Sequence, residues 1–225
     1  MIDDNWELIN GPDAHEIEVL NYSSQINVLE ALVKFTMHHH PVVADKGSSG
    51  YPNALALVEI HRTGTLFLLS KPGEFRDNEV HVQKPDGTVV YQPPPPAEVR
   101  RHVDELITEL GARWEGSSAI QVAAFCLWKI NWIHPFKNGN GRCARAFMYA
   151  CLCLKLGFML PGSPTIIDLI SADKKPFEDA LQAADKALAD TGKVDCTELE
   201  NYLEGLLIQQ LSSIPPAEDP SELPT

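Results

Sequence analysis

The sequence has no hydrophobic run long enough to cross a membrane and no excess of basic residues. Its longest apolar run, residues 146–154, is far shorter than the roughly 20 residues that a membrane helix needs. With 31 acidic and 18 basic residues the net charge is −13, whereas nucleic-acid binders rely on clustered basic groups. We therefore expect no membrane and no nucleic-acid partner. A local anion site built from a few arginines and backbone N–H groups stays compatible with this charge.

Cysteines are few and odd in number. Of the five, Cys126, Cys143, Cys151 and Cys153 fall in segments that we expect to be helical. Buried, reduced thiols are typical of a reducing compartment. The first residues also lack the basic and apolar regions of a secretory signal. These features predict a cytoplasmic protein.

The composition, 44% apolar and 22% charged, is that of a globular domain. It predicts three parts: an irregular acidic N-terminal lead at 1–24, a folded domain at 25–212 and a proline-rich acidic flexible tail at 213–225. We expect the first helix to end before Pro41, because proline disfavours a helical conformation in the residue before it. Apolar spacing and cap residues predict a mainly α fold with helices at 25–38, 53–69, 97–110, 118–133, 141–156, 176–189 and 197–211.

One β element is expected among these helices. Residues 79–91 contain two short β-branched runs on either side of Pro85-Asp86-Gly87. Proline presets φ at such a turn, and glycine accepts a positive φ. The pattern predicts a β-hairpin whose first run includes Val80, His81 and Val82.

The most informative segment is the loop His134-Pro-Phe-Lys-Asn-Gly-Asn-Gly-Arg142 between the two central helices. Gly139 and Gly141 permit backbone turns that aim N–H groups inward as an anion nest. The following helix adds its positive N-terminal end. Arg142 and Arg145 project from its first turn on one side and suit bidentate binding of phosphate oxygens.

Three further residues complete this loop. The imidazole of His134 at the loop mouth could accept a proton near neutral pH, and Phe136 is expected to anchor the loop in the core. Asn140 stands between the two glycines. The coincidence of these residues with the glycines and arginines predicts a phosphate-binding loop with a resident base.

The loop resembles the signature of the Fic family, His-Pro-Phe-x-(Asp/Glu)-Gly-Asn-(Gly/Lys)-Arg, commonly followed by x-x-Arg. The resemblance covers residues 25–211 and implies a Fic-type helical bundle with a small β-hairpin flap. It is carried further by Ile60-His61, Gly73-Glu-Phe-Arg76, the 79–91 hairpin, Pro93-Pro94 and the segments at 177–182 and 199–203.

The resemblance implies a transferase that moves AMP from ATP, as co-substrate, onto a serine, threonine or tyrosine hydroxyl of a target protein. It makes His134 the general base and Phe136 the anchor that holds the loop to the core. The hairpin, with Val80, His81 and Val82, would be the flap that aligns the target by strand pairing. The nucleotide phosphates would be bound by Gly139, Asn140, Gly141, Arg142 and Arg145.

Position 138 departs from the family pattern. Fic proteins place a carboxylate there that holds Mg²⁺, and this chain has Asn138, whose carbonyl contributes no charge. Three interpretations follow: a weakly held, nucleotide-carried Mg²⁺ with slower AMP transfer, a donor other than ATP, or a nucleotide-binding or toxin–antitoxin-like interaction module with little turnover. The sequence does not choose among them.

Many Fic proteins are inhibited by a glutamate in the pattern (Ser/Thr)-x-x-x-Glu-(Gly/Asn), which pairs with the second arginine of the signature. No segment here matches. The nearest, Cys196-Thr-Glu-Leu-Glu200-Asn201, has cysteine at the hydroxyl position, and we interpret it as a chance near-match. A separate inhibitory antitoxin and the absence of an inhibitor both stay open.

Overall fold

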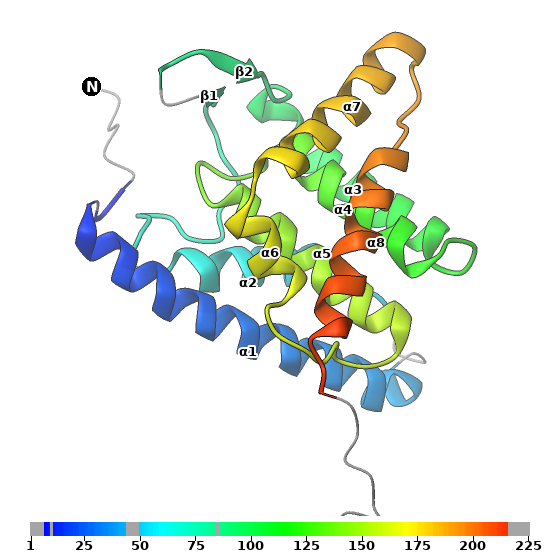
Figure 1. Ribbon diagram of the computed structural model, residues 1–225. Coiled ribbons are helices and arrows are strands. Elements are labelled where there is room, and N and C mark those ends of the chain that lie inside the picture. The colour runs from blue at the N-terminus through cyan, green and yellow to red at the C-terminus, as the bar shows by residue number, and fades with distance from the viewer. Residues whose placement is uncertain (1–6, 10, 44–49, 84–85, 216–225) are drawn as a thin grey trace, which may run out of the picture.

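The computed structural model describes residues 7–9, 11–43, 50–83 and 86–215 of the 225-residue chain. It is mainly α-helical with one two-stranded antiparallel sheet (Figure 1). The expected class, a helical bundle with a β-hairpin, is confirmed. In chain order the elements are α1 (Pro12–Val43), α2 (Ala54–Thr65), β1 (Val82–Gln83), β2 (Val89–Tyr91), the 3₁₀ turn η2 (Pro96–Glu98), α3 (Val99–Trp114), α4 (Ala119–Ile133), α5 (Asn140–Leu156), α6 (Ile166–Ala172), α7 (Lys175–Thr191) and α8 (Thr197–Ser212).

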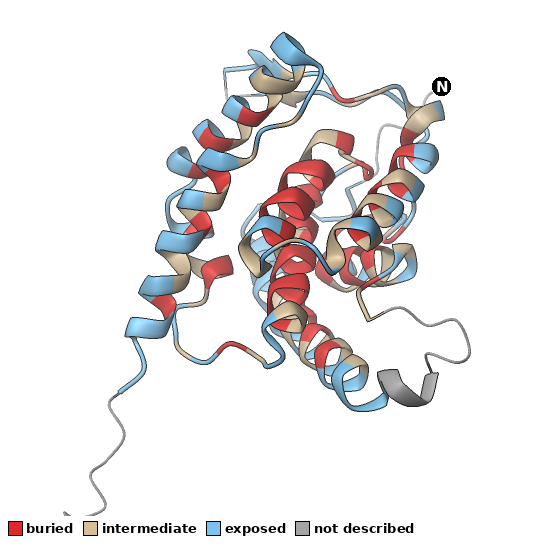
Figure 2. Cartoon of the chain, turned by 90° about the vertical axis from the view of Figure 1, so that its right-hand side faces the viewer, coloured by how far each residue is buried: buried red, intermediate tan, exposed pale blue. Residues whose placement is uncertain are grey.

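Helices α4 and α5 form the centre of the bundle. The start of α4 and the end of α5 lie where the sequence predicts them. The Ser118 hydroxyl accepts the Gln121 N–H, and the Gln121 side chain accepts the Ser118 N–H, which completes a capping box at the start of α4. Gly157 ends α5 with a φ of +81°. Figure 2 shows the centre of the bundle buried on nearly all sides.

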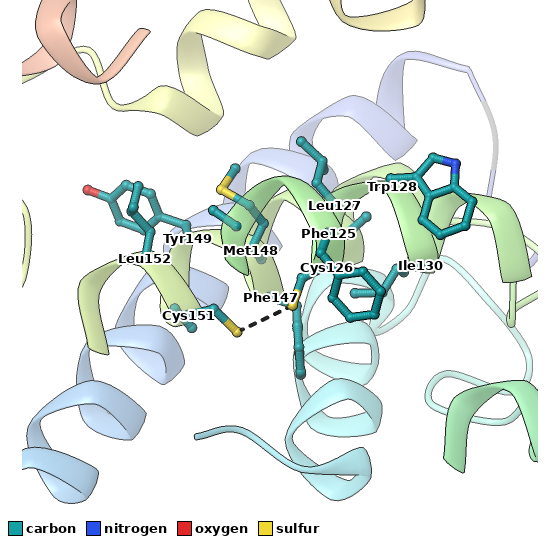
Figure 3. Close-up of a cluster of buried hydrophobic side chains, with 14 of the residues drawn as sticks. Phe125, Cys126, Leu127, Trp128, Ile130, Phe147, Met148, Tyr149, Cys151 and Leu152 are labelled. Carbon is teal, nitrogen blue, oxygen red and sulfur yellow. Dashed lines mark hydrogen bonds between the residues drawn. The ribbon is translucent and has the colours of Figure 1, made fainter. Parts of the chain in front are cut away.

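The two central helices meet through large apolar side chains and thiols (Figure 3). Phe125 and Phe147 are buried between them, and Sγ of Cys126 lies 3.9 Å from Sγ of Cys151. All four cysteines of α4 and α5 are buried and free of disulfides. Burial raises the pKa of Cys153 to about 11, so this thiol stays protonated at neutral pH. These cysteines therefore pack as small apolar residues.

Helix α1 differs from its prediction at both ends. It begins at Pro12, within the lead that we expected to be irregular, and it continues past Pro41 to Val43. Buried polar side chains explain the early start: Nδ2 of Asn21 donates to the Leu66 carbonyl at 2.8 Å, and Nε2 of Gln25 donates to the Ile60 carbonyl at 2.8 Å. These bonds attach α1 to α2 without the apolar spacing on which the prediction relied. Pro41 removes only one helical hydrogen bond near the end.

The hairpin is shorter than predicted, since only Val82 of the three expected residues lies in a strand. Val82 is opposite Tyr91 and Gln83 is opposite Val89, with a bulge between the pairs. Helix α6 was not predicted, although Thr165 and Asp168 form a capping box at its start. The predicted tail follows the end of α8, and its residues 216–225 lie outside the described part.

Candidate active site

The loop that connects α4 to α5 turns through two positive-φ residues. His134 ends α4 with φ +50° and ψ +59°, and Gly139 precedes α5 with φ +76°. A Cβ at Gly139 would lie 2.6 Å from Cγ2 of Thr65 and 3.3 Å from Nε2 of His61. Glycine is therefore required there both for its backbone angle and for the close approach of the loop to α2.

His61 of α2 binds the middle of the loop by a hydrogen bond and by ring stacking. The Gly73 N–H donates to its Nδ1 at 2.9 Å, so the hydrogen resides on Nε2, which donates to the Asn138 carbonyl at 2.8 Å. The ring also stacks on Phe136, with 3.6 Å between centroids and 6° between planes. Burial lowers the pKa of His61 to about 4. The His61 ring is therefore neutral, and both of its nitrogens are engaged in hydrogen bonds.

Arg76 holds the start of the loop and is only 3% exposed. Its Nε donates to the His134 carbonyl at 2.7 Å, and its backbone N–H donates to the Pro135 carbonyl at 2.9 Å. Its two terminal nitrogens reach the carbonyls of Asn78, Pro94 and Ile133. A cation thus stabilises the negative C-terminal end of α4. Its role is structural, through backbone carbonyls rather than through a paired acid.

Asn140 closes the loop on itself. Its Oδ1 accepts the Phe136 N–H at 2.9 Å, and its Nδ2 donates to the Phe136 carbonyl at 2.8 Å. Phe136 is fully buried, as expected of an anchor. The Asn140 side chain is thereby committed to the loop backbone, which leaves its main-chain N–H at the start of α5 for a ligand.

His134 differs from His61 because one of its ring nitrogens, Nε2, has no hydrogen-bond partner among the described residues. Its Nδ1 lies 3.3 Å from the Asn131 carbonyl, an acceptor, so the hydrogen resides on Nδ1 and Nε2 keeps its lone pair. Burial and the nearby charge of Arg76 lower the pKa of His134 to about 4. At neutral pH the ring is therefore uncharged, with Nε2 able to accept a proton.

Arg142 and Arg145 carry buried N–H groups without hydrogen-bond partners among the described residues, namely Nη1 of Arg142 and Nε of Arg145. Nη1 of Arg142 lies 3.1 Å from Oε1 of Glu18 on α1, an ion-pair distance without hydrogen-bond geometry. Burial first, then the neighbouring Arg142, lowers the pKa of Arg145. Two unsatisfied guanidinium groups beside a helix N-terminus favour an anion.

Gly141 lies beside Arg145, and Asn138 lies two residues before α5. A Cβ at Gly141 would lie 3.3 Å from Nη1 of Arg145, so the missing side chain leaves space for that guanidinium. Oδ1 of Asn138 accepts the Gly139 N–H at 2.6 Å, and Nδ2 donates to Oε1 of Glu7 at 3.4 Å. The Gly139 N–H is therefore engaged by a neighbouring side chain, and the free N–H groups of the first turn belong to the residues that follow.

A groove of about 330 Å³ lies beside His134. We call it the flap groove, since it runs between the hairpin, α4 and α7. Of the expected flap residues only Val82 lines it, and Val80 and His81 lie outside. Its walls are Val82, Gln83, Val90, Tyr91, Trp128, Asn131, Trp132, His134, Phe177, Glu178, Leu181, Gln182 and Asp185.

Glu18 and Asp185 were not singled out from the sequence, because they meet the loop or the groove only in the fold and no local pattern marks them. The α7 segment 177–182 carried part of the family resemblance, but its place in the wall of a groove is visible only in the fold. The structure brings together His134, Arg76 and His61 around one loop, and Arg142 with Arg145 at the start of α5. The nucleotide-binding and catalytic roles of the loop residues stay predictions. No helix in the described ranges is long and apolar enough to span a membrane.

Comparison with known proteins finds similarity around the loop and in the fold. Residues 51–152 match the model of the Fic/DOC family. A Fic-domain signalling protein of Bacteroides thetaiotaomicron superposes with a TM-score of 0.70 at 19% identity, over 91% of this chain and 72% of the other. Residues 134–508 of Fic-1 from C. elegans give 0.61 at 18% identity, over 94% of this chain and 53% of the other, so this chain spans about half of that segment. BepC of Bartonella tribocorum, solved with AMPPNP, gives 0.50 at 19% identity, over 88% of both.

Proposed function

We propose that this chain, whose residues 51–152 match the model of the Fic/DOC family, transfers AMP from ATP to a protein hydroxyl. Members of that family generally transfer AMP or other nucleotide-linked groups to proteins. The observation that carries the proposal is a pair of buried guanidinium nitrogens beside the N-terminus of α5, Nη1 of Arg142 and Nε of Arg145, which make no hydrogen bond to any described residue. A buried donor without a partner is costly. Phosphate oxygens would satisfy both groups and neutralise their charge. The AMPPNP bound to the structurally similar BepC supports a nucleotide as that ligand.

His134 supplies the base in this proposal. Its Nε2 takes the proton of the incoming serine, threonine or tyrosine hydroxyl, while Nδ1–H keeps the ring oriented through the Asn131 carbonyl. The hydroxyl oxygen then attacks the α-phosphorus, the bond to the bridging oxygen breaks, and pyrophosphate leaves. Arg142, Arg145 and the N–H groups of the first turn of α5 stabilise the negative charge on the phosphates.

The family implies a Mg²⁺ ion, and the oxygens near Asn138 fit it modestly. No group of three or more His, Cys, Asp or Glu in the described ranges could hold a metal. Asn138 Oδ1 and the Glu7 carboxylate, 3.4 Å from Asn138 Nδ2, are the hard ligands at this position. Glu7 would return the negative charge that Asn138 lacks. When bound, Mg²⁺ neutralises phosphate charge, and these two residues would hold an ion that arrives on the nucleotide.

The alternative is a binding module that keeps the phosphate site with little turnover. The observation that favours it is Glu18, whose carboxylate already pairs with Arg142, one of the two arginines proposed to bind phosphate. A second alternative, a donor other than ATP, keeps the same residues in the same roles. We keep AMP transfer as the main proposal because His134 has the tautomer and the neutral charge that a base requires.

One assay tests these proposals. Purified chain is incubated with α-labelled ATP, Mg²⁺ or Mn²⁺ and a lysate as the source of targets, and labelled protein is measured. We expect label with the wild type and a loss of about 10²–10⁴-fold for His134→Ala, with nucleotide affinity retained. His39→Ala, which alters an exposed histidine of α1, is the control and keeps full labelling.

The variant Asn138→Asp separates the interpretations of position 138. Higher activity in this variant ties a slow wild type to the metal. Label from GTP, UTP or CTP in place of ATP identifies another donor. Nucleotide binding without label in both proteins contradicts the transferase proposal and leaves the binding module.

A further inference from the structure

The flap groove is a candidate binding site for the target segment, in addition to being the place where His134 lies. Its walls come from three parts of the chain: the hairpin, the last two turns of α4 and one face of α7, seen together in the upper part of Figure 1. His134 lies at the groove, whereas Arg142 and Arg145 are absent from its lining. The groove is therefore distinct from the proposed phosphate site, and the shared residue is the base that receives the hydroxyl proton.

The walls of the groove are largely apolar. Val82 and Val90 come from the hairpin, Trp128 from α4, and Phe177 and Leu181 from α7. Val90 is 40% exposed although it is a large apolar residue. About 330 Å³ is enough for one or two side chains of an extended segment. An apolar side chain that entered it would lose contact with water against these walls.

The charges that line the groove have one sign. Glu178 and Asp185 project from α7, and no lysine or arginine is among the lining residues of the described chain. Asp185 accepts a hydrogen bond from Nε1 of Trp128 at 2.9 Å through Oδ1, which leaves Oδ2 for a ligand. Burial raises the pKa of Asp185, so a bound cation would stabilise its charged form.

The two lysines within α7 pair with acids outside the groove. Lys175 pairs with Asp179, and Lys186 pairs with Asp190 at 2.9 Å. Lys129 of α4 lies near Trp128 and Trp132 but pairs with Glu109 at 3.3 Å. Neither carboxylate of the groove is neutralised by these lysines. The negative potential of the groove is thus open to a ligand.

We propose that the flap groove selects target segments that place a large apolar side chain and a lysine or arginine next to the modified hydroxyl. This inference rests on the proposed transfer to a protein hydroxyl and adds the class of target. The basic residue pairs with Asp185 and Glu178, and the apolar residue packs against the valines and Trp128. Acidic segments are rejected, because their charge would face two carboxylates.

Peptide binding without nucleotide tests the inference independently of catalysis. Three fluorescein-labelled nine-residue peptides share a central threonine and a leucine two positions away, and they carry lysine, serine or glutamate at one position on each side. Fluorescence anisotropy at low salt gives the dissociation constants. We expect the lysine peptide to bind about tenfold more tightly than the serine peptide, and the glutamate peptide to bind more weakly than both.

Matched variants show whether the two carboxylates cause this preference. In Glu178→Gln/Asp185→Asn the lysine and serine peptides are expected to bind within about twofold of each other; an amide oxygen at position 185 can still accept the Trp128 N–H. The control Asp179→Asn/Asp190→Asn removes the same charge from the exposed side of α7 and keeps the tenfold preference. Circular dichroism confirms that both variants are folded.

The outcomes separate the inference from the proposed function. Equal affinities for the three peptides, a preference that persists without the two carboxylates, or no binding at all overturns the inference. Label transfer from α-labelled ATP to the same peptides is measured in parallel. If the lysine peptide binds more tightly but no label is transferred, the inference about the groove is supported and the proposed transferase activity is contradicted. If label is transferred without a preference for the lysine peptide, the transferase activity is supported and the inference about the groove is contradicted.

Discussion

Two sets of residues in and around the loop at 134–142 differ in how their polar groups are bonded. In the bracing region, formed by His61, Arg76 and Asn140, the side-chain nitrogens and oxygens make hydrogen bonds to the backbone. In the open region, formed by His134, Arg142 and Arg145, one nitrogen of each side chain lacks a hydrogen-bond partner in the described structure. Each region contains a histidine with a pKa of about 4, the buried His61 in the first and the half-buried His134 in the second.

The difference teaches how to separate structural from chemical residues of the same type. A lowered pKa does not distinguish His61 from His134, because burial is its main cause in both. The ring nitrogen without a hydrogen-bond partner in the described structure, Nε2 of His134, distinguishes the two histidines. A fully bonded polar group stabilises the fold, whereas an unbonded buried donor destabilises it until a ligand arrives. Mutations in the two regions should therefore act on different quantities.

The largest effect is expected from Arg76→Met in the bracing region. This change leaves the carbonyls of His134, Asn78 and Pro94 without their donor. We expect a loss of about 3–5 kcal/mol in the free energy of unfolding, measured by urea denaturation. An unchanged free energy of unfolding in Arg76→Met would contradict the distinction between the two regions, because Arg76 would then not stabilise the loop. Arg100→Met, at an exposed arginine of α3, is the control.

A pH titration is expected to show the next effect. The pKa of His61 is about 4 in the fold against 6.5 in a free chain, so the unfolded state binds the proton first as the pH falls. The stability is thus complete above pH 6.5 and declines as the pH falls toward 4, by about 3 kcal/mol for this residue. We expect the decline in melting temperature between pH 7 and 4.5 to be smaller in His61→Gln. An unchanged decline would mean that His61 is protonated in the fold.

In the open region, Arg145→Met should separate binding from stability. Removal of a buried charge with an unpaired N–H leaves the free energy of unfolding unchanged or slightly increases it. The affinity for ATP falls by about tenfold or more, because a charge-assisted contact worth about 1.5–3 kcal/mol is lost. Calorimetric titration and thermal melts measure both on the same sample. A large loss of stability would place Arg145 in the bracing region.

The smallest effect is expected from Glu18→Gln. The carboxylate is 46% exposed and lies 3.1 Å from Arg142, so a phosphate has to displace it. Its neutralisation should raise the affinity for ATP by a few-fold, because partly exposed ion pairs contribute below about 1 kcal/mol. The neighbouring Glu16→Gln, on the same helix, is the control. A lower affinity in Glu18→Gln would show that Glu18 assists the nucleotide.

The open region could be predicted from the sequence, and most of the bracing region could not. His134, Arg142 and Arg145 stand within one short segment whose residue types define its chemistry. Asn140 belongs to that segment, but its bonds to Phe136 depend on the turn that the loop adopts. His61 and Arg76 reach the loop across 77 and 58 residues of sequence, and no periodicity links such distant positions.

The helices show the same limit. The capping box at Ser118 and the glycine at 157 are local signals, and both predicted ends are correct. The early start of α1 involves Asn21, which lies before the predicted helix and donates to the carbonyl of Leu66 just after α2. A method that searches for apolar stripes interprets such residues as exposed. Buried amides that replace apolar contacts are visible only once the partner helix is known.

The left-handed conformation of His134 has a consequence for protein engineering. With φ at +50° this residue adopts a geometry that glycine accepts at lower cost, by about 1–2 kcal/mol. A laboratory selection for heat resistance alone would favour glycine at position 134 and discard the imidazole. A histidine rather than a glycine at this left-handed position can therefore serve as a criterion when similar sequences are screened for active proteins.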